Sequence, residues 1–203
     1  AKGDLAVGLK YYDEAIQQNS PQSMALLERK AVVLFNLRKF QESADAYQAY
    51  SVKFSNDPQA DKMFYRSNVA LSRLQQSEAY AAVIRNTSKF IQEKSTSNPL
   101  YAPFLLIRAQ AYENTNQWFL ASDDYVNIVR KFTTDSSAKE AIIGATELLK
   151  KAGRYTEAIE LQHIYASQHG NDPSIAEQWF DICSEMFEQA KYKLVVPELV
   201  RLI

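Results

Sequence analysis

The chain has 203 residues, of which 46% are hydrophobic and 23% are charged, and its formal net charge is -1. This balance gives no electrostatic reason to expect nucleic acid or an anionic membrane surface as a partner. No apolar run approaches the ~18 residues that a membrane-spanning helix needs, so direct membrane insertion is not expected.

Large residues, most of them aromatic, recur at intervals of 35 to 40 positions. They are Leu5, Phe40, Tyr80, Trp118, Tyr155 and Tyr192. Periods of this size are typical of stacked helical hairpins, in which each unit buries its apolar face only against its neighbours. The sequence therefore predicts an all-α solenoid. The recurring aromatic residues are expected to pack inside it.

In chain order, the pattern predicts a lone helix followed by five hairpins. The units are 1–19 (a half repeat), 20–55, 57–95, 99–134, 136–170 and 173–203. The second unit, around Tyr80, is the weakest match, and its phase is open by one residue. Small residues are expected to let the two helix axes of a hairpin approach closely. These residues are Ala31, Ala109, Ala121 and Ala158.

The first helix of each hairpin is expected to begin at a capping residue. Asp57 precedes Pro58, and Asp172 precedes Pro173, which pairs an acidic N-cap with a residue suited to the first helical position. Ser137-x-x-Glu140 has the spacing of a capping box.

The third unit carries the clearest motif. It reads Leu105-x-x-Arg108-Ala109-x-x-Tyr112, followed by Trp118-x-x-Ala121-x-x-x-Tyr125. This pattern resembles the tetratricopeptide repeat, or TPR. The resemblance implies a right-handed α-α superhelix in which residues 1–203 form a single solenoid segment. The period exceeds the family's usual length of about 34 residues, which resembles the longer variant of bacterial cell-envelope scaffolds.

The resemblance also implies a function. TPR arrays bind peptides or protein segments in a groove lined by the first helix of each hairpin, so we expect a non-catalytic protein-binding scaffold. The candidate binding residues by register are Arg29, Phe35, Asn36, Asn68, Ser72, Gln75, Gln110, Glu113, Asn114, Glu147, Lys150, Lys151 and Asp181. The basic clamp with which some members of the family hold a chaperone's terminal carboxylate has no counterpart here.

The residues that could carry chemistry have structural interpretations instead. The sequence contains no glycine-rich phosphate loop, G-x-S-x-G, H-E-x-x-H or C-x-x-C motif. His163 and His169 are six residues apart, which does not place them on one helical face, and Asp123 and Asp124 are adjacent. Cys183 is expected to be a small buried residue. We therefore expect no enzyme activity, no metal site and no cofactor.

Two alternatives to the scaffold remain open. The apolar residues near the C-terminus could form a self-association surface, through which copies of the chain stack. They are Leu194, Val195, Val196, Leu199, Val200, Leu202 and Ile203. Alternatively, the repeats could regulate a catalytic domain outside this sequence. The chain is expected to be part of a longer bacterial protein, and the resemblance favours the periplasmic side of the cell envelope over the cytoplasm.

Overall fold

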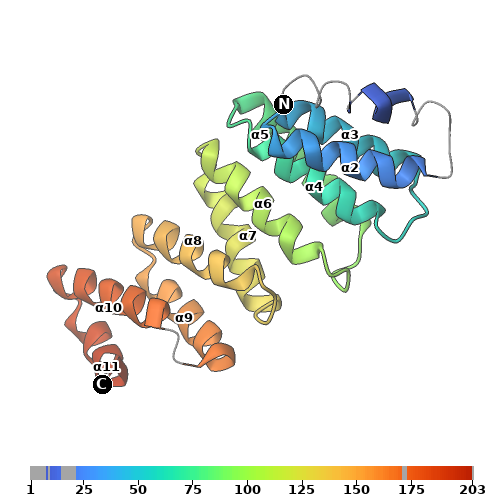
Figure 1. Ribbon diagram of the computed structural model, residues 1–203. Coiled ribbons are helices and arrows are strands. Elements are labelled where there is room, and N and C mark those ends of the chain that lie inside the picture. The colour runs from blue at the N-terminus through green and yellow to red at the C-terminus, as the bar shows by residue number, and fades with distance from the viewer. Residues whose placement is uncertain (1–7, 9, 15–21, 171–172, 203) are drawn as a thin grey trace. The chain divides into compact units, whose positions relative to one another are not determined.

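The computed structural model describes residues 8, 10–14, 22–170 and 173–202, and it is all-helical, with no strand among these residues (Figure 1). The chain divides into two compact units, Ala1–Leu100 and Tyr101–Ile203. The all-α prediction is confirmed. That residues 1–203 form one continuous solenoid stays a prediction. Most of the expected half repeat 1–19 lies outside the described residues, although residues 10–14 are helical.

The first unit contains two hairpins. Hairpin one consists of α2 (Ser23–Asn36) and α3 (Phe40–Lys53), and hairpin two of α4 (Ala60–Ser72) and α5 (Ser77–Glu93). Each helix packs on the next along the chain. The core joins three helices, and it consists of Leu27, Ala31, Leu34, Ala46, Tyr47, Tyr50 and Met63. An ion pair between Lys30 and Asp13 attaches the helical residues 10–14 to α2.

The second unit contains three hairpins. Hairpin three consists of α6 (Tyr101–Asn114) and α7 (Trp118–Lys131), and hairpin four of α8 (Ala138–Lys151) and α9 (Tyr155–His169). Hairpin five consists of α10 (Pro173–Glu188) and α11 (Tyr192–Leu202). Besides the contacts between consecutive helices, α7 contacts α9 and α8 contacts α10. The first helices of hairpins four and five are therefore neighbours, and so are the second helices of hairpins three and four.

The second helices begin at the recurring aromatic residues in four hairpins out of five. Their first residues are Phe40, Ser77, Trp118, Tyr155 and Tyr192. In hairpin two the sequence-based register is wrong by three residues, because Tyr80 lies one turn inside α5 while Ser77 opens the helix. The intervals between second-helix starts are therefore 37, 41, 37 and 37 residues.

The turn within each hairpin has a recurring backbone feature. Two positions before the second helix, one residue adopts a positive φ of 54° to 71°. These residues are Arg38, Gln75, Asn116, Gly153 and Ala190. In hairpin four, the Arg154 N–H donates to the Leu149 carbonyl at 2.8 Å, which is the six-residue closure of a Schellman turn. The positive-φ backbone conformation of the turn thus recurs at the same position in all five hairpins, more regularly than the aromatic side chain does.

The connections between hairpins differ from the expected caps. The Asp57 carboxylate accepts the Gln59 N–H at 2.7 Å, and the Asp135 carboxylate accepts the Ser137 N–H at 2.8 Å. Each aspartate stabilises a tight turn before its helix, which then begins at Ala60 or Ala138. The predicted capping box at Ser137 is wrong, because this residue makes no side-chain cap bond. Helix α10 begins at Pro173 as predicted, and Asp172 lies outside the described residues.

Small residues do line the close helix contacts. The predicted Ala31, Ala109, Ala121 and Ala158 are completely buried. A close approach also occurs at Gly144 of α8, where a Cβ atom would lie 2.6 Å from the Tyr125 ring of α7.

Hairpin three has a buried ion pair between its two helices. The Arg108 guanidinium binds the Asp124 carboxylate in a bidentate manner, with Nε–Oδ2 and Nη2–Oδ1 distances of 2.7 Å. Hairpin four has completely buried Ala145 and Leu161 at the positions 37 residues later. The same backbone positions thus hold an ion pair in one hairpin and apolar side chains in the next.

Candidate functional site

Helices α2, α3 and α4 of unit one form a shallow pocket. Its volume is about 260 Å³, and it is lined by Val32, Phe35, Tyr47, Arg66 and Val69. Arg66 links α4 to α2 through a 2.7 Å ion pair with Glu28, and its guanidinium carbon lies 5.9 Å from the centroid of the Tyr47 ring. Of the predicted binding residues, Phe35 lines this pocket, while Arg29 and Asn36 are exposed outside its lining.

The predicted binding role of Asn68 is wrong, because this side chain is completely buried. Its amide nitrogen donates to the Phe64 carbonyl at 2.8 Å, and its oxygen accepts from Asn86 of α5 at 3.1 Å. Ser72 is half-buried and donates to the Val69 carbonyl, and Gln75 is the exposed positive-φ residue of the turn. Asn68 therefore joins α4 to α5 rather than facing a partner.

The first helices of unit two bring three predicted residues together. Glu147, Lys150 and Asp181 surround a pocket of about 200 Å³, with Ile143, Thr146 and Gln178 completing its lining. Lys150 also forms a 2.7 Å ion pair with Glu185. The side-chain oxygen of Gln178 is buried and has no hydrogen-bond partner among the described residues. This pocket is the part of the predicted surface that the structure assembles most completely.

Other predicted residues of unit two have partners within the protein. Gln110 donates to Glu140 of α8 at 2.6 Å, and Asn114 donates to the Gln110 carbonyl. Glu113 accepts from the Tyr125 hydroxyl at 2.9 Å; burial and then this carboxylate raise the pKa of Tyr125. Lys151 pairs with Glu147, and this hydrogen bond raises the pKa of Lys151.

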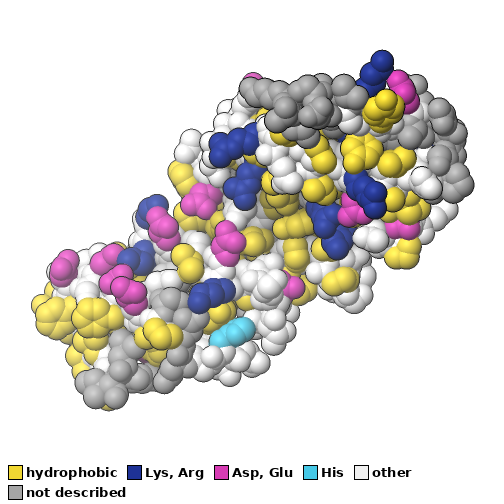
Figure 2. All heavy atoms as spheres, viewed as in Figure 1, with side chains coloured by type: hydrophobic (Ala, Val, Ile, Leu, Met, Phe, Trp, Pro, Cys, Tyr) yellow, Lys and Arg dark blue, Asp and Glu magenta, His cyan; other side chains and the backbone are white. Residues whose placement is uncertain are grey.

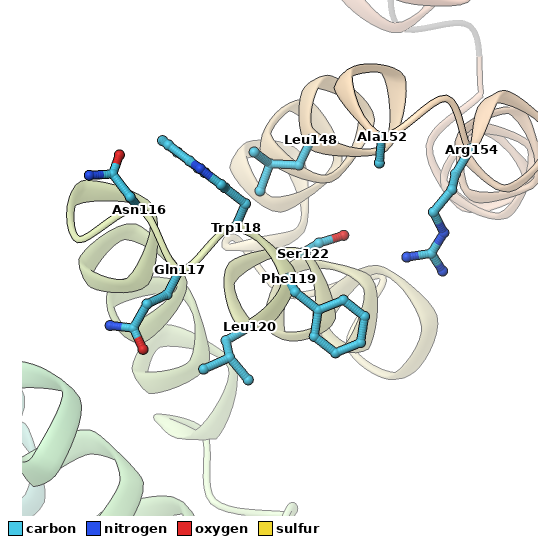
Figure 3. A pocket seen from close by; sticks show the side chains of 9 residues that line it. All are labelled: Asn116, Gln117, Trp118, Phe119, Leu120, Ser122, Leu148, Ala152 and Arg154. Carbon is cyan, nitrogen blue, oxygen red and sulfur yellow. The ribbon is translucent and has the colours of Figure 1, made fainter.

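A second surface, which the sequence did not predict, lies at the turn edge of hairpins three and four (Figure 3). We call it the edge groove. It consists of two adjoining pockets of about 540 and 270 Å³ that share Trp118, Leu148 and Ala152. The remaining lining residues are Asn116, Gln117, Phe119, Leu120, Ser122, Lys151 and Arg154.

The edge groove corrects the interpretation of the recurring aromatic residues. Tyr155 is buried, with an exposed fraction of 8%, whereas Trp118 and Tyr192 are 47% and 49% exposed. The prediction that these residues pack inside the protein is therefore confirmed for Tyr155 and wrong for Trp118 and Tyr192. Trp118 is followed by the exposed Phe119 and Leu120. Three consecutive residues of a helix cannot share one face. The run of three large apolar residues was therefore the sequence signal that at least one of them faces outward.

The histidines and the cysteine are held in structural contacts. Nε2 of His163 lies 2.9 Å from Glu198, and Nε2 of His169 lies 2.6 Å from the Thr133 carbonyl. Cys183 is completely buried as predicted, and burial, followed by the Glu198 charge, raises the pKa of its thiol. No group of three or more metal-ligating side chains gathers within the described ranges.

The sequence matches no model of a protein family and no curated protein. None of the helices in the described part of the chain combines the length and apolar character that crossing a membrane requires.

Proposed function

We propose that this chain is a non-catalytic scaffold of the tetratricopeptide kind, which binds a peptide or protein segment along the first helices of its hairpins. Within each unit, we propose that the hairpins stack in the right-handed sense of that family. The observation that carries the proposal is the pocket between α8 and α10, where Glu147, Lys150 and Asp181 are brought together from two hairpins.

The geometry of this pocket suits an extended segment. Glu147 and Asp181 are exposed, and Ile143 adds an apolar surface that is 41% exposed. Side chains of both signs lie beside this apolar residue, so the pocket complements a peptide that carries charged as well as apolar side chains. Such charge complementarity selects among partners more than it adds affinity. A bacterial, periplasmic origin remains part of this proposal and rests on the repeat length alone.

The test uses peptides of known sequence. Random peptides displayed on phage are selected against the immobilised full chain, and individual winners are synthesised and titrated by calorimetry. The double variant Glu147→Lys with Asp181→Lys should weaken the binding of most winners at least about tenfold. Its thermal midpoint should stay close to wild type, because the exposed Glu147–Lys151 pair contributes little stability. Failure to enrich any peptide, or binding unaffected by the double variant, would contradict the proposal.

A second candidate function is self-assembly through the C-terminal hairpin. Apolar side chains gather over the α10 and α11 end (Figure 2). Those with exposed fractions of 49% to 67% are Phe180, Phe187, Tyr192, Leu194, Val196 and Val200. Of the apolar end expected from the sequence, Val195 is instead buried, and the side chains of Leu202 and Ile203 lie outside the described residues. Exposed apolar surface of this kind marks interaction sites.

Light scattering of the purified chain over a range of concentrations tests the second candidate. Self-assembly predicts a mass that rises with concentration and returns to that of the monomer in the Val196→Glu, Val200→Glu double variant. A monomer at all concentrations would exclude it.

A further inference from the structure

The edge groove is open because two positions carry small side chains. Its counterpart in the repeat lies under Tyr155, 37 residues after Trp118, and that counterpart is covered. The Gln189 side chain donates to the Tyr155 hydroxyl at 2.7 Å, and the Lys191 ammonium lies 4.3 Å from the ring centroid. Buried Ile159 lies one turn further along α9.

Two of the matching positions of the edge groove carry smaller residues, and the third carries Arg154, which forms an ion pair with Glu157. Ala152 stands where Gln189 covers Tyr155, and Ser122 stands where hairpin four has the buried Ile159. Arg154 stands where Lys191 covers the ring. The exchange of Gln for Ala and of Ile for Ser removes most of the side-chain volume that would otherwise cover Trp118. The groove is therefore a departure from the repeat at specific residues.

The lining of the groove indicates the chemistry of its occupant. Trp118, Phe119, Leu148 and Ala152 form an apolar floor, and none of the described lining residues is acidic. Lys151 lines one of the two pockets and Arg154 the other. An apolar floor with a cation in each pocket complements an apolar side chain flanked by carboxylates. The combined volume is in the range of sites that accept large side chains or small ligands, about 300 to 1,000 Å³.

The Ser122 hydroxyl is a second, independent sign of a missing partner. Ser122 has an exposed fraction of only 5%, and its side-chain oxygen has no hydrogen-bond partner among the described residues. In Figure 3 this hydroxyl points toward the space in front of Arg154. A buried hydroxyl without a partner is unfavourable, and an acceptor group placed beside Arg154 relieves this cost.

We propose that the edge groove is a docking site for an acidic peptide segment. It places one large apolar side chain over Trp118 and Leu148 and its neighbouring carboxylates against Lys151 and Arg154. Lys151 belongs to both this site and the predicted first-helix surface, where it pairs with Glu147. The other residues of this site differ from those of the first-helix surface, so it is a second binding site.

The test is a fluorescence titration of the full chain. The chain contains two tryptophans. A Trp179→Phe background makes Trp118 the one reporter, and it removes an indole N–H that has no partner among the described residues. The probe is a capped peptide of sequence Gly-Glu-Asp-Phe-Asp-Glu-Gly, and the control peptide has lysine at each acidic position. We expect a blue shift of the Trp118 emission with the acidic peptide and an affinity at least about tenfold above that of the control.

Two sets of variants locate the binding. Ser122→Ile with Ala152→Gln introduces the residues of the covered site and should abolish the blue shift. If that variant fails to fold, Lys151→Ala with Arg154→Ala serves in its place, because both side chains are exposed and their surface ion pairs contribute little stability. The alanine pair should remove the preference for the acidic peptide.

The matched control separates this site from the first-helix surface. Asp181→Lys alone, which keeps the Glu147 partner of Lys151 in place, should leave the blue shift intact. Equal affinity for the two peptides, or a blue shift that survives both sets of edge-groove variants, would overturn the proposal. Neither result would bear on the peptides selected at the first-helix surface.

Discussion

Hairpins three and four share a backbone register but use different side-chain chemistry. Positions 37 residues apart hold Arg108 and Asp124 in the former, and Ala145 and Leu161 in the latter. Trp118 is half-exposed beside an open groove, whereas its counterpart Tyr155 is covered. In this pair of hairpins, the turn and the helix positions repeat, while the surfaces between hairpins diverge. A repeat can thus keep its backbone and acquire a binding site through a few small residues.

The largest expected effect comes from breaking the ion pair of hairpin three. Arg108→Ala leaves the buried Asp124 charge without its partner, and we expect a loss of about 3–5 kcal/mol in the free energy of unfolding. Adding Asp124→Leu gives hairpin three the residues of hairpin four, and the double variant should recover most of that loss. Urea unfolding followed by circular dichroism measures both. A double variant no more stable than Arg108→Ala would show that the two hairpins are not interchangeable at these positions.

The next effect concerns the contact between the two hairpins. Gly144→Ala places a methyl group against the Tyr125 ring, so we expect a loss of about 1–3 kcal/mol from overpacking despite the higher helix propensity of alanine. Hairpin four has Gln162 where hairpin three has Tyr125. In a Tyr125→Gln background the ring is gone, and Gly144→Ala should be neutral or stabilising. An unchanged cost in that background would place the strain elsewhere.

The turns offer a smaller contrast. Gly153 adopts a φ of +71° with no atom within 4 Å of its Cβ position, so Gly153→Ala isolates the backbone cost, about 1–2 kcal/mol. The matching residue of hairpin three is Asn116, with a φ of +60°. Asn116→Gly should therefore stabilise the chain by a few tenths of a kcal/mol. Thermal unfolding of the two variants measures the difference, and a destabilising Asn116→Gly would contradict the shared turn geometry.

The smallest effect is a pH dependence that Tyr125 gives to hairpin three. Because burial and the Glu113 carboxylate raise the pKa of Tyr125 above its usual value, the folded chain keeps this proton where the unfolded chain loses it. Stability should therefore fall as pH rises above ~10, by about 1 kcal/mol at pH 11. Tyr125→Phe should reduce the slope between pH 10 and 11. An identical slope in the variant would show that Tyr125 does not contribute.

The sequence predicted the helical hairpins well where an aromatic residue opens the second helix. Trp118, Tyr155 and Tyr192 each stand at that position, so their spacing reproduced the register. Hairpin two was placed wrongly because Ser77 occupies the opening position and Tyr80 is one turn later. The positive-φ turn fixes the register. The positive-φ position leaves little trace in the sequence, because only one of the five residues that occupy it, Gly153, is a glycine.

The candidate site was harder to predict than the fold. Asn68 has the spacing of a surface residue, but its burial depends on Asn86 in the next helix, which spacing does not reveal. The edge groove becomes visible only when the residues that cover Tyr155 are compared with the residues 37 positions earlier, around Trp118. That comparison requires the register of the turns. Even so, the apolar run from Trp118 to Leu120 was a visible sign that part of this helix start faces outward.

The measurement that tests the central claim most directly is a proton–nitrogen correlation spectrum of the tryptophan indoles during titration with the acidic peptide. Trp118 lines the edge groove, whereas Trp179 packs edge-on against His163, with ring centroids 4.4 Å apart. We predict that the Trp118 signal moves while the Trp179 signal stays in place, and that Ser122→Ile with Ala152→Gln abolishes the movement. A Trp118 signal that stays fixed, or two signals that move together, would contradict a binding site created by the departure of hairpin three from its neighbour.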